Sequence, residues 1–318
     1  MFEPVRLGLA LGAGGARGLA HIGVLKALER AGVKISFLSG SSLGALVGGL
    51  YAHCLSADEV ERKIQDFLAG DLFKKTRLSL VKEVFHDRSA SLYSRVETFI
   101  KKAYLHTLML TRSSILDPDL YQALIEALVP PVRIEDLPLG FSAVSTDLKS
   151  GRPVLFRSGP LRRAVAASAA LPGVIQPLAF QGLVLTDGGV LHKVPVEPLR
   201  CMGADKVLAV DVEMEETVKD EDGPLRGIEV LFRVEDIENY TLKETALGTA
   251  DLVLRPRVGH IHWSDFEHLA EMIQVGQDEV TEKLDDIRRL ARRRTLPFRL
   301  SRPARARPAA CWLDWIEI

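Results

Sequence analysis

Ser42 lies at the centre of GSSLG at residues 40–44, which has the pattern G-x-S-x-G. A short apolar run at residues 35–38 precedes it, and the small, apolar stretch LGALVGGLYAHCL follows it. A serine on a sharp turn from strand to helix is presented as a nucleophile, and small neighbours such as Gly40 and Gly44 make room for that turn. Free N–H groups at the start of the following helix would favour a developing negative charge. The pattern indicates acyl transfer through a serine, although a polar residue in a tight turn would look the same.

A glycine-rich loop, GAGGARG at residues 12–18, joins the apolar run of residues 5–11 to a helical pattern. Such a loop brings backbone N–H groups close to a ligand. A dinucleotide fingerprint has a third glycine where this loop has Arg17, and no Gly-Lys-Ser/Thr closes it as in a P-loop. The remaining interpretation is an oxyanion hole beside Ser42. Its donors would be the N–H groups of Gly14, Gly15 and Ala16.

The order of these motifs separates the chain from the common serine hydrolases. An α/β-hydrolase carries its nucleophile after several strands, whereas here it follows the second predicted strand. The stretches LGAGGARGLAHIGVLKALE, GSSLGA, ASAALPGVIQPL and DGGV together resemble the patatin-like phospholipase family, from residue 5 to about residue 211. The resemblance implies a serine–aspartate dyad in place of a triad, with Ser42 as its nucleophile. The motif residues that match, besides the nucleophile and the donors, are Gly12, Arg17, Gly18, Gly40, Gly44, Gly188 and Gly189.

Asp187, in LVLTDGGV, matches the dyad base of that family. It follows the short apolar run of residues 183–185, and two glycines after it allow close backbone approach. A partly buried carboxylate at this position could take the proton of Ser42. The alternative is a turn in which the side chain only satisfies local N–H groups. Asp147 and Asp211 also end apolar runs and are the reserve candidates.

Two departures from the family pattern concern the surroundings of the site. Ala13 stands where many members have another glycine, and LHKVPV at residues 191–196 replaces a stretch that often contains asparagines. His21 lies one turn into the helix after the glycine loop, where a structural histidine is the ordinary interpretation. The pair His260 and His262 has no evident third ligand, so the sequence predicts neither a metal site nor a cofactor.

Apolar runs alternate with helical patterns along the chain, which predicts an α/β fold with a mostly parallel central sheet flanked by helices in the three-layer patatin-like architecture. The strand-like runs are residues 5–11, 35–38, 140–146, 153–157, 183–185, 206–212 and 251–255. The third and fourth of these read as a hairpin. Residues 1–287 are expected to form the catalytic domain, with a helical insert at about 57–128 that could serve as a lid or acyl-chain channel. Residues 288–318 are expected to be an arginine-rich tail.

The charges exclude a strongly basic, nucleic-acid-binding protein, because the net charge is −1. Arginines gather at residues 288–307, ahead of the apolar CWLDWIEI. This stretch is interpreted as a disordered tail, and the alternative is peripheral contact with an anionic membrane. The two long uncharged stretches are residues 35–57 and 164–186. Glycines in the first stretch, and glycines and prolines in the second, disfavour a continuous helix, so no membrane-spanning helix is expected. Three cysteines without metal spacing favour the cytoplasm, including the inner membrane surface if the tail binds lipid.

The sequence therefore predicts a serine acyl hydrolase. The resemblance implies a lipid ester substrate, of phospholipase or lysophospholipase type, and no cofactor. Acyl transfer to an acceptor other than water uses the same covalent intermediate and is the alternative within enzymes. A regulatory protein that keeps the fold without turnover is the alternative outside them. The headgroup, the chain length and the oligomeric state do not follow from the sequence.

Overall fold

The computed structural model describes residues 5–76, 114–213, 227–292 and 315–318, and these residues contain a nine-stranded sheet. The strands are β1 (Leu7–Leu11), β2 (Phe37–Ser41), β3 (Gly140–Asp147), β4 (Arg152–Phe156), β5 (Leu178–Phe180), β6 (Leu183–Asp187), β7 (Lys206–Val210), β8 (Leu252–Leu254) and β9 (Ile316–Glu317). The α-helices are α1 (Ala20–Arg30), α2 (Leu43–Cys54), α3 (Ala57–Ala69), α4 (Asp71–Lys74), α7 (Pro118–Leu128), α8 (Leu161–Ser168), α9 (Val196–Met202), α10 (Gly227–Leu247), α11 (Leu269–Glu282) and α12 (Leu284–Ala291). Short 3-10 helices are η1 (Gly15–Leu19), η2 (Ile134–Asp136), η3 (Gly188–Val190) and η4 (Phe266–His268).

The sheet is mostly parallel, with the order β5-β6-β3-β2-β1-β7-β8. Strands β1, β2, β3, β7 and β8 are parallel to one another, while β5, β6 and β4 add antiparallel pairs. Every residue of β1 is buried, as a strand covered on both faces must be. The predicted hairpin between β3 and β4 is confirmed by their antiparallel register.

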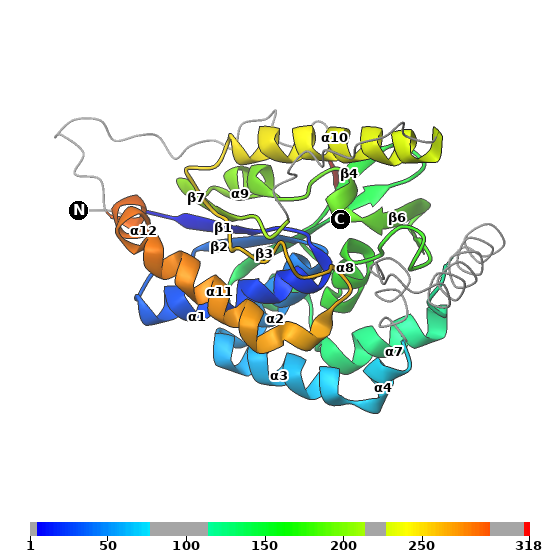
Figure 1. The fold of residues 1–318 in the computed structure, drawn as a ribbon, viewed down its shortest axis with the longest axis horizontal. Coiled ribbons are helices and arrows are strands. Elements are labelled where there is room, and N and C mark those ends of the chain that lie inside the picture. The colour runs from blue at the N-terminus through cyan, green and yellow to red at the C-terminus, as the bar shows by residue number, and fades with distance from the viewer. Residues whose placement is uncertain (1–4, 77–113, 214–226, 293–314) are drawn as a thin grey trace, which may run out of the picture.

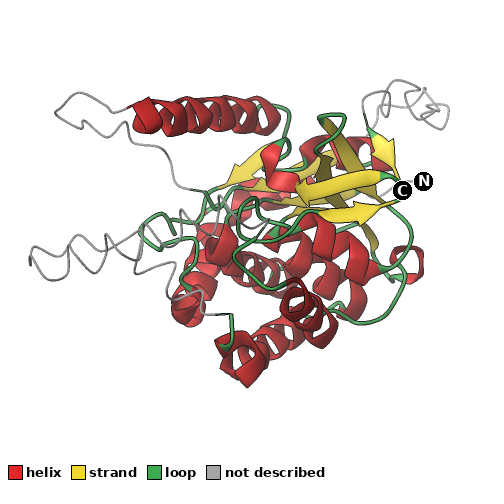
Figure 2. Cartoon of the chain, turned by 90° about the vertical axis from the view of Figure 1, so that its right-hand side faces the viewer, coloured by secondary structure: helices red, strands yellow, loops and turns green. Residues whose placement is uncertain are grey.

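Helices cover both faces of the sheet, so the predicted α/β class and layer arrangement are confirmed. In Figure 1, α9 and α10 lie above the sheet, whereas α1, α2 and α11 lie below it. Figure 2 shows the strands between these two layers. Helices α3 and α7 form a further tier beyond α2, in contact with α2 and α8 respectively. The apolar core therefore lies on both sides of β1 and β2, and it continues beneath α2.

The edge of β3 decides the geometry of the site. Strand β2 pairs with β3 along Gly140 to Val144, and β6 pairs with β3 along Ser145 to Asp147. Because β4 pairs with β3 from Ala143 to Asp147 and a strand has only two edges, β2 and β6 must share the other edge. Their carboxyl ends meet there, with Ser41 opposite Val144 and Asp187 opposite Ser145.

The expected helical insert and the expected C-terminal tail are described only in part. The insert at 57–128 contains α3, α4 and α7, while its residues 77–113 lie outside the described residues. The expected tail is not uniform, because α12 extends to Ala291 and the last residues form β9 beside β4. Trp315 is buried there, since its ring packs against Val144 and Leu155. Among the described helices, none has the length and apolar character that a bilayer crossing requires.

Candidate active site

Ser42 occupies the sharp turn between β2 and α2 that the sequence predicted. Its backbone has φ 54° and ψ −124°, a conformation that costs a non-glycine residue about 1–3 kcal/mol. The turn is held in place by Ser168, whose buried Oγ accepts a hydrogen bond from the Ser42 N–H at 3.0 Å. This turn conformation presents the Ser42 side chain at the end of the sheet, next to the first turn of α2.

The motif glycines lie where two backbones come into contact. A Cβ on Gly44 would collide with the carbonyl oxygens of Leu11 and Gly12, so α2 could not begin beside β1 with any other residue. A Cβ on Gly40 would collide with the backbone of Gly44. For the others, the nearest atoms to such a Cβ would be Val210 O at 2.8 Å for Gly12, Leu43 Cβ at 2.9 Å for Gly18 and Ala13 Cβ at 2.9 Å for Gly189.

The glycine loop is tied down at both of its ends. The Gly12 N–H donates to Val210 O at 3.0 Å, and the Ala13 N–H donates to Lys193 O at 2.7 Å. At the other end, the Ala16 N–H donates to Trp263 O at 2.6 Å. Arg17 Nε donates to the carbonyl oxygen of Ile261 at 2.7 Å, so this side chain anchors the loop to a distant segment. The loop is thus a rigid element fixed from both sides.

Between these tethers, the N–H groups of Gly14 and Gly15 have no hydrogen-bond partner among the described residues. Gly15 lines the same cavity as Ser42 and has φ +56°. The two N–H groups are therefore available to an acceptor, and their role in an oxyanion hole stays a prediction. The Ala16 N–H is not available in this structure, because the Trp263 carbonyl takes it. Sequence reasoning could not find this tether, which joins residues far apart in the chain.

Asp187 ends β6 and is almost completely buried, with 3% of its surface exposed. Its Oδ1 accepts the Gly189 N–H at 2.6 Å, while Oδ2 accepts no hydrogen bond of standard geometry from a described residue. Burial raises the pKa of Asp187 to about 6, against the lowering effects of the Ser42 side chain, the Gly189 N–H and the charge of Lys193. The carboxyl is therefore within hydrogen-bonding reach of the Ser42 hydroxyl, whose proton it could accept.

The glycines after Asp187 bring its backbone against β3. A Cβ on Gly188 would collide with the carbonyl oxygen of Val144, and a Cβ on Gly189 would lie 3.9 Å from Ser41 Oγ. These contacts follow from the shared edge of β3 described above. The tight packing holds Asp187 beside the Ser42 turn.

The reserve aspartates have structural partners. Burial would raise the pKa of Asp147, but hydrogen bonds from the N–H groups of Val184 and Ser150 and from the Ser150 hydroxyl hold it below its usual value. Asp211 forms a buried ion pair with Lys243, whose Nζ lies 3.3 Å from Oδ2. Both carboxyls are thus engaged by structural partners away from Ser42.

The three histidines considered from the sequence, His21, His260 and His262, have structural partners among the described residues. His21 is fully buried, its Nε2 is 2.8 Å from Gly12 O, and burial lowers its pKa to about 4. A neutral ring whose Nε2–H donates to that carbonyl supports the glycine loop. His260 contacts Glu271 at 2.7 Å and His262 contacts Ser264 Oγ at 2.8 Å. No group of three or more metal-ligating side chains is assembled within the described ranges.

A narrow apolar cavity of about 180 Å³ opens at Ser42. Its walls come from α2, α3, α7 and the 263–266 segment, with side chains such as Leu46, Leu124 and Phe266. Tyr121 also lines it, and its hydroxyl donates to Ala166 O at 2.7 Å. Sequence reasoning missed Tyr121 and the role of Ser168, although Ser168 stands in the quoted ASAALPG motif. The cavity suits an extended hydrocarbon chain.

Comparisons with known proteins identify the family of the chain. The family model for patatin-like phospholipase matches residues 9–200. The chain belongs to the patatin-like phospholipase family. Uncharacterized NTE family proteins of Mycobacterium tuberculosis and Mycobacterium bovis are 36% identical over 244 residues, which cover 76% of this chain and 57% of theirs.

Other patatin-like relatives are much longer than this chain. Patatin-like phospholipase domain-containing protein 6 of Homo sapiens is 34% identical over 208 residues, or 65% of this chain and 13% of that protein. A lysophospholipase of Scheffersomyces stipitis is 28% identical over 295 residues, or 85% and 17%. The chain thus spans little more than half of the mycobacterial relatives and a smaller part of the others. Among solved structures, VipD from Legionella pneumophila has a similar fold, with a TM-score of 0.50, 16% identity, and coverage of 89% of this chain and 67% of that chain.

Proposed function

We propose that this patatin-like protein is a serine hydrolase of lipid esters that uses Ser42 and Asp187 as a catalytic dyad. The observation that carries the proposal is the buried carboxyl of Asp187, which contacts the hydroxyl of a strained Ser42 at the mouth of an apolar cavity. The family membership supports lipid hydrolysis in general. The lysophospholipase among the relatives supports a phospholipid or lysophospholipid as the substrate.

The reaction would proceed in two halves. Ser42 Oγ attacks the ester carbonyl carbon while Asp187 takes the hydroxyl proton. The carbonyl oxygen becomes an oxyanion that accepts hydrogen bonds from the N–H groups of Gly14 and Gly15. Collapse of this intermediate expels the alcohol, which receives the proton from Asp187, and leaves an acyl group on Ser42. In the second half, Asp187 takes a proton from water, the resulting hydroxide attacks the acyl-enzyme, and the proton returns to Ser42 as the acid is released.

The electrostatics of Asp187 suit this role. An ordinary aspartate is too weak a base to take a serine proton near neutral pH, and a pKa of about 6 brings its basicity closer to what the transfer needs. The carboxyl still ionises at neutral pH, so the base is ready before substrate binds. The same residue can act as acid in one step and base in the next, which makes a histidine unnecessary.

The test uses a fluorophosphonate probe and p-nitrophenyl esters with the wild type, Ser42→Ala and Asp187→Asn. Loss of labelling and turnover in Ser42→Ala, and loss of turnover by about 10²–10⁴ in Asp187→Asn, are expected while circular dichroism stays unchanged. Asp147→Asn is the control for a nearby aspartate without a catalytic role. A wild type that neither labels nor turns over would favour a regulatory protein of the same fold.

Two finer points belong to the same proposal. Product analysis with an added alcohol acceptor separates hydrolysis from acyl transfer, since both pass through the acyl-enzyme. Membrane contact through the arginines of residues 288–307, most of which lie outside the described residues, is tested by liposome flotation. Equal flotation with those arginines changed to glutamine would contradict a role for this stretch.

A further inference from the structure

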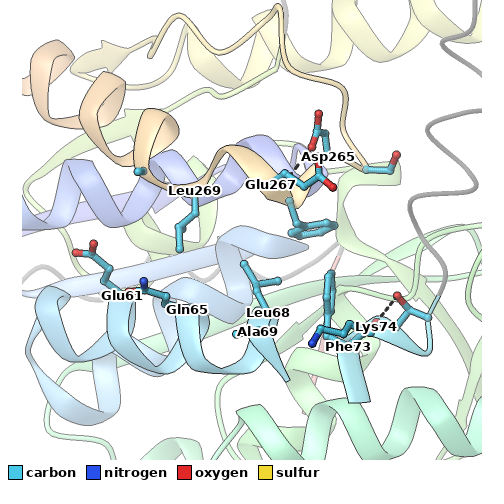
Figure 3. A pocket seen from close by; sticks show the side chains of 13 residues that line it. Glu61, Gln65, Leu68, Ala69, Phe73, Lys74, Asp265, Glu267 and Leu269 are labelled. Atoms are coloured by element: carbon cyan, nitrogen blue, oxygen red, sulfur yellow. Dashed lines mark hydrogen bonds between the residues drawn. The ribbon is translucent and has the colours of Figure 1, made fainter. Parts of the chain in front are cut away.

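A second, larger cavity lies beside the one that holds Ser42. Its volume is about 670 Å³, and Figure 3 shows it between α3 and the segment that leads into α11. Leu68, Ala69 and Leu269 give it apolar surface, while Glu61 and Lys74 lie at more polar parts of the wall. The inner cavity, by contrast, is almost entirely apolar. The outer cavity thus adjoins the inner one and has a more polar lining.

Leu68, Phe73, Thr76 and Phe266 line both cavities, and the two phenylalanines have the largest side chains of the four. Phe73 and Phe266 each line both cavities, so the two rings form part of the partition between them. Their centroids are 5.4 Å apart with the rings inclined at 75°, an edge-to-face contact. Phe67 extends this row on the inner side, with its centroid 5.6 Å from that of Phe73. An acyl chain that enters from Ser42 would meet these rings.

The two halves of the partition are anchored very differently. Phe266 begins η4, where Asp265 caps the Glu267 N–H at 3.2 Å, and the same segment holds the glycine loop through Trp263 O. Phe73 stands on the four-residue helix α4, which Gly70 separates from α3. The ion pair between Lys74 and Asp71 on this helix is exposed, so it adds little rigidity. Phe73 is therefore the half of the partition that can move.

The volume of the inner cavity limits the chain it can hold. At about 180 Å³ the inner cavity is much smaller than the outer one of about 670 Å³, so it holds only part of a long acyl chain. Such a chain must either stay partly in water or displace Phe73 and continue into the outer cavity. Opening the partition separates the edge-to-face pair and exposes both rings.

We propose that Phe73 and Phe266 set the acyl-chain length by closing the inner cavity, and that removing the Phe73 ring joins the two cavities into one long acyl channel. This inference rests on the proposed function, since it assigns specificity to the same site. The wild type then favours short and medium acyl chains. The outer cavity receives the end of a longer chain only when the Phe73 ring is absent or displaced.

The experiment compares kcat/KM for p-nitrophenyl butyrate, octanoate and laurate, each below its micelle concentration. Each additional methylene that leaves water raises kcat/KM about fourfold, from ~0.8 kcal/mol per buried group. In the wild type the increase should stop near the octanoate. In Phe73→Ala the ratio of laurate to butyrate should rise at least about tenfold, because the outer cavity shelters only part of the added chain.

Matched variants separate a joined cavity from a loosened helix. Leu72→Ala lies on the same short helix and lines neither cavity, so its chain-length profile should match that of the wild type. Phe73→Leu and Phe266→Leu keep an apolar side chain while shortening the partition, and they serve if the alanine variant does not fold. Both should shift the profile towards laurate.

The outcomes distinguish the inference from the function it rests on. If the wild type turns over butyrate and Phe73→Ala keeps the wild-type profile, the partition does not set chain length and the inference is wrong. The same follows if Leu72→Ala shifts the profile as much as Phe73→Ala does. If no ester is hydrolysed by any variant, the proposed function and the inference both fail.

Discussion

Replacing Asp187 by asparagine should stabilise the fold near neutral pH while it abolishes turnover. Burial raises the pKa of this carboxyl from about 3.8 to about 6, so the native state holds a proton that the unfolded state releases. Two units of pKa correspond to about 3 kcal/mol. The contribution of Asp187 to the free energy of unfolding should therefore fall by about 3 kcal/mol as pH rises from below 4 to above 6. Asparagine cannot ionise, and it keeps an oxygen for the Gly189 N–H.

Urea denaturation of both proteins at about pH 4 and about pH 8 measures this difference. The stability of Asp187→Asn relative to the wild type should increase by about 3 kcal/mol between the two conditions. All other titrating groups cancel in the comparison, because the two proteins differ at one residue. A relative stability that is independent of pH would refute the reasoning, since the carboxyl would then titrate alike in both states.

Asp147→Asn gives the matched control with the opposite sign. This carboxyl is also buried, but its hydrogen bonds from Val184 and Ser150 hold its pKa below the usual value. The native state favours the ionised form, which stabilises the fold at pH values above the pKa of Asp147 in the unfolded state. This stabilisation is lost as the pH falls through the lower pKa of Asp147 in the native state. The asparagine variant should therefore be less stable than the wild type near neutral pH. A stabilised Asp147→Asn would show that these hydrogen bonds do not outweigh the effect of burial at Asp147.

Three further predictions concern activity and packing. The kcat/KM of the wild type should rise with pH and level off above about pH 6, because Asp187 must be ionised to accept the serine proton; a flat profile from pH 5 to 8 would contradict this assignment. His21→Leu leaves the buried Gly12 carbonyl without its donor and should cost about 1–3 kcal/mol in urea denaturation, while His21→Gln should restore part of that stability. Gly188→Ala places a Cβ against the Val144 carbonyl and should lower the stability by about 1–3 kcal/mol, with loss of turnover in the ester assay.

Much of the fold could be predicted from local patterns. The apolar runs located seven of the strands to within a few residues, and the glycine loop and GSSLG marked two strand-to-helix turns, because such turns need small residues in fixed places. Two short strands were not predicted. β5 has only three residues, and β9 is formed by the last residues of the chain, whose pairing with β4 depends on a contact across more than 150 positions. Local sequence carries too little signal for either.

At the site, the sequence by itself determined the types and order of the chemical groups. It supplied a serine between glycines, a loop of bare N–H groups and an aspartate at a strand end, since each depends on neighbours within a few residues. Only the tertiary structure decided how they meet. β2 and β6 share one edge of β3, which brings Ser42 beside Asp187. Burial at this position raises the pKa of the Asp187 carboxyl. The Ala16 tether, the Ser168 support and the phenylalanine partition join segments distant in the chain, and such contacts arise from packing that local sequence does not encode.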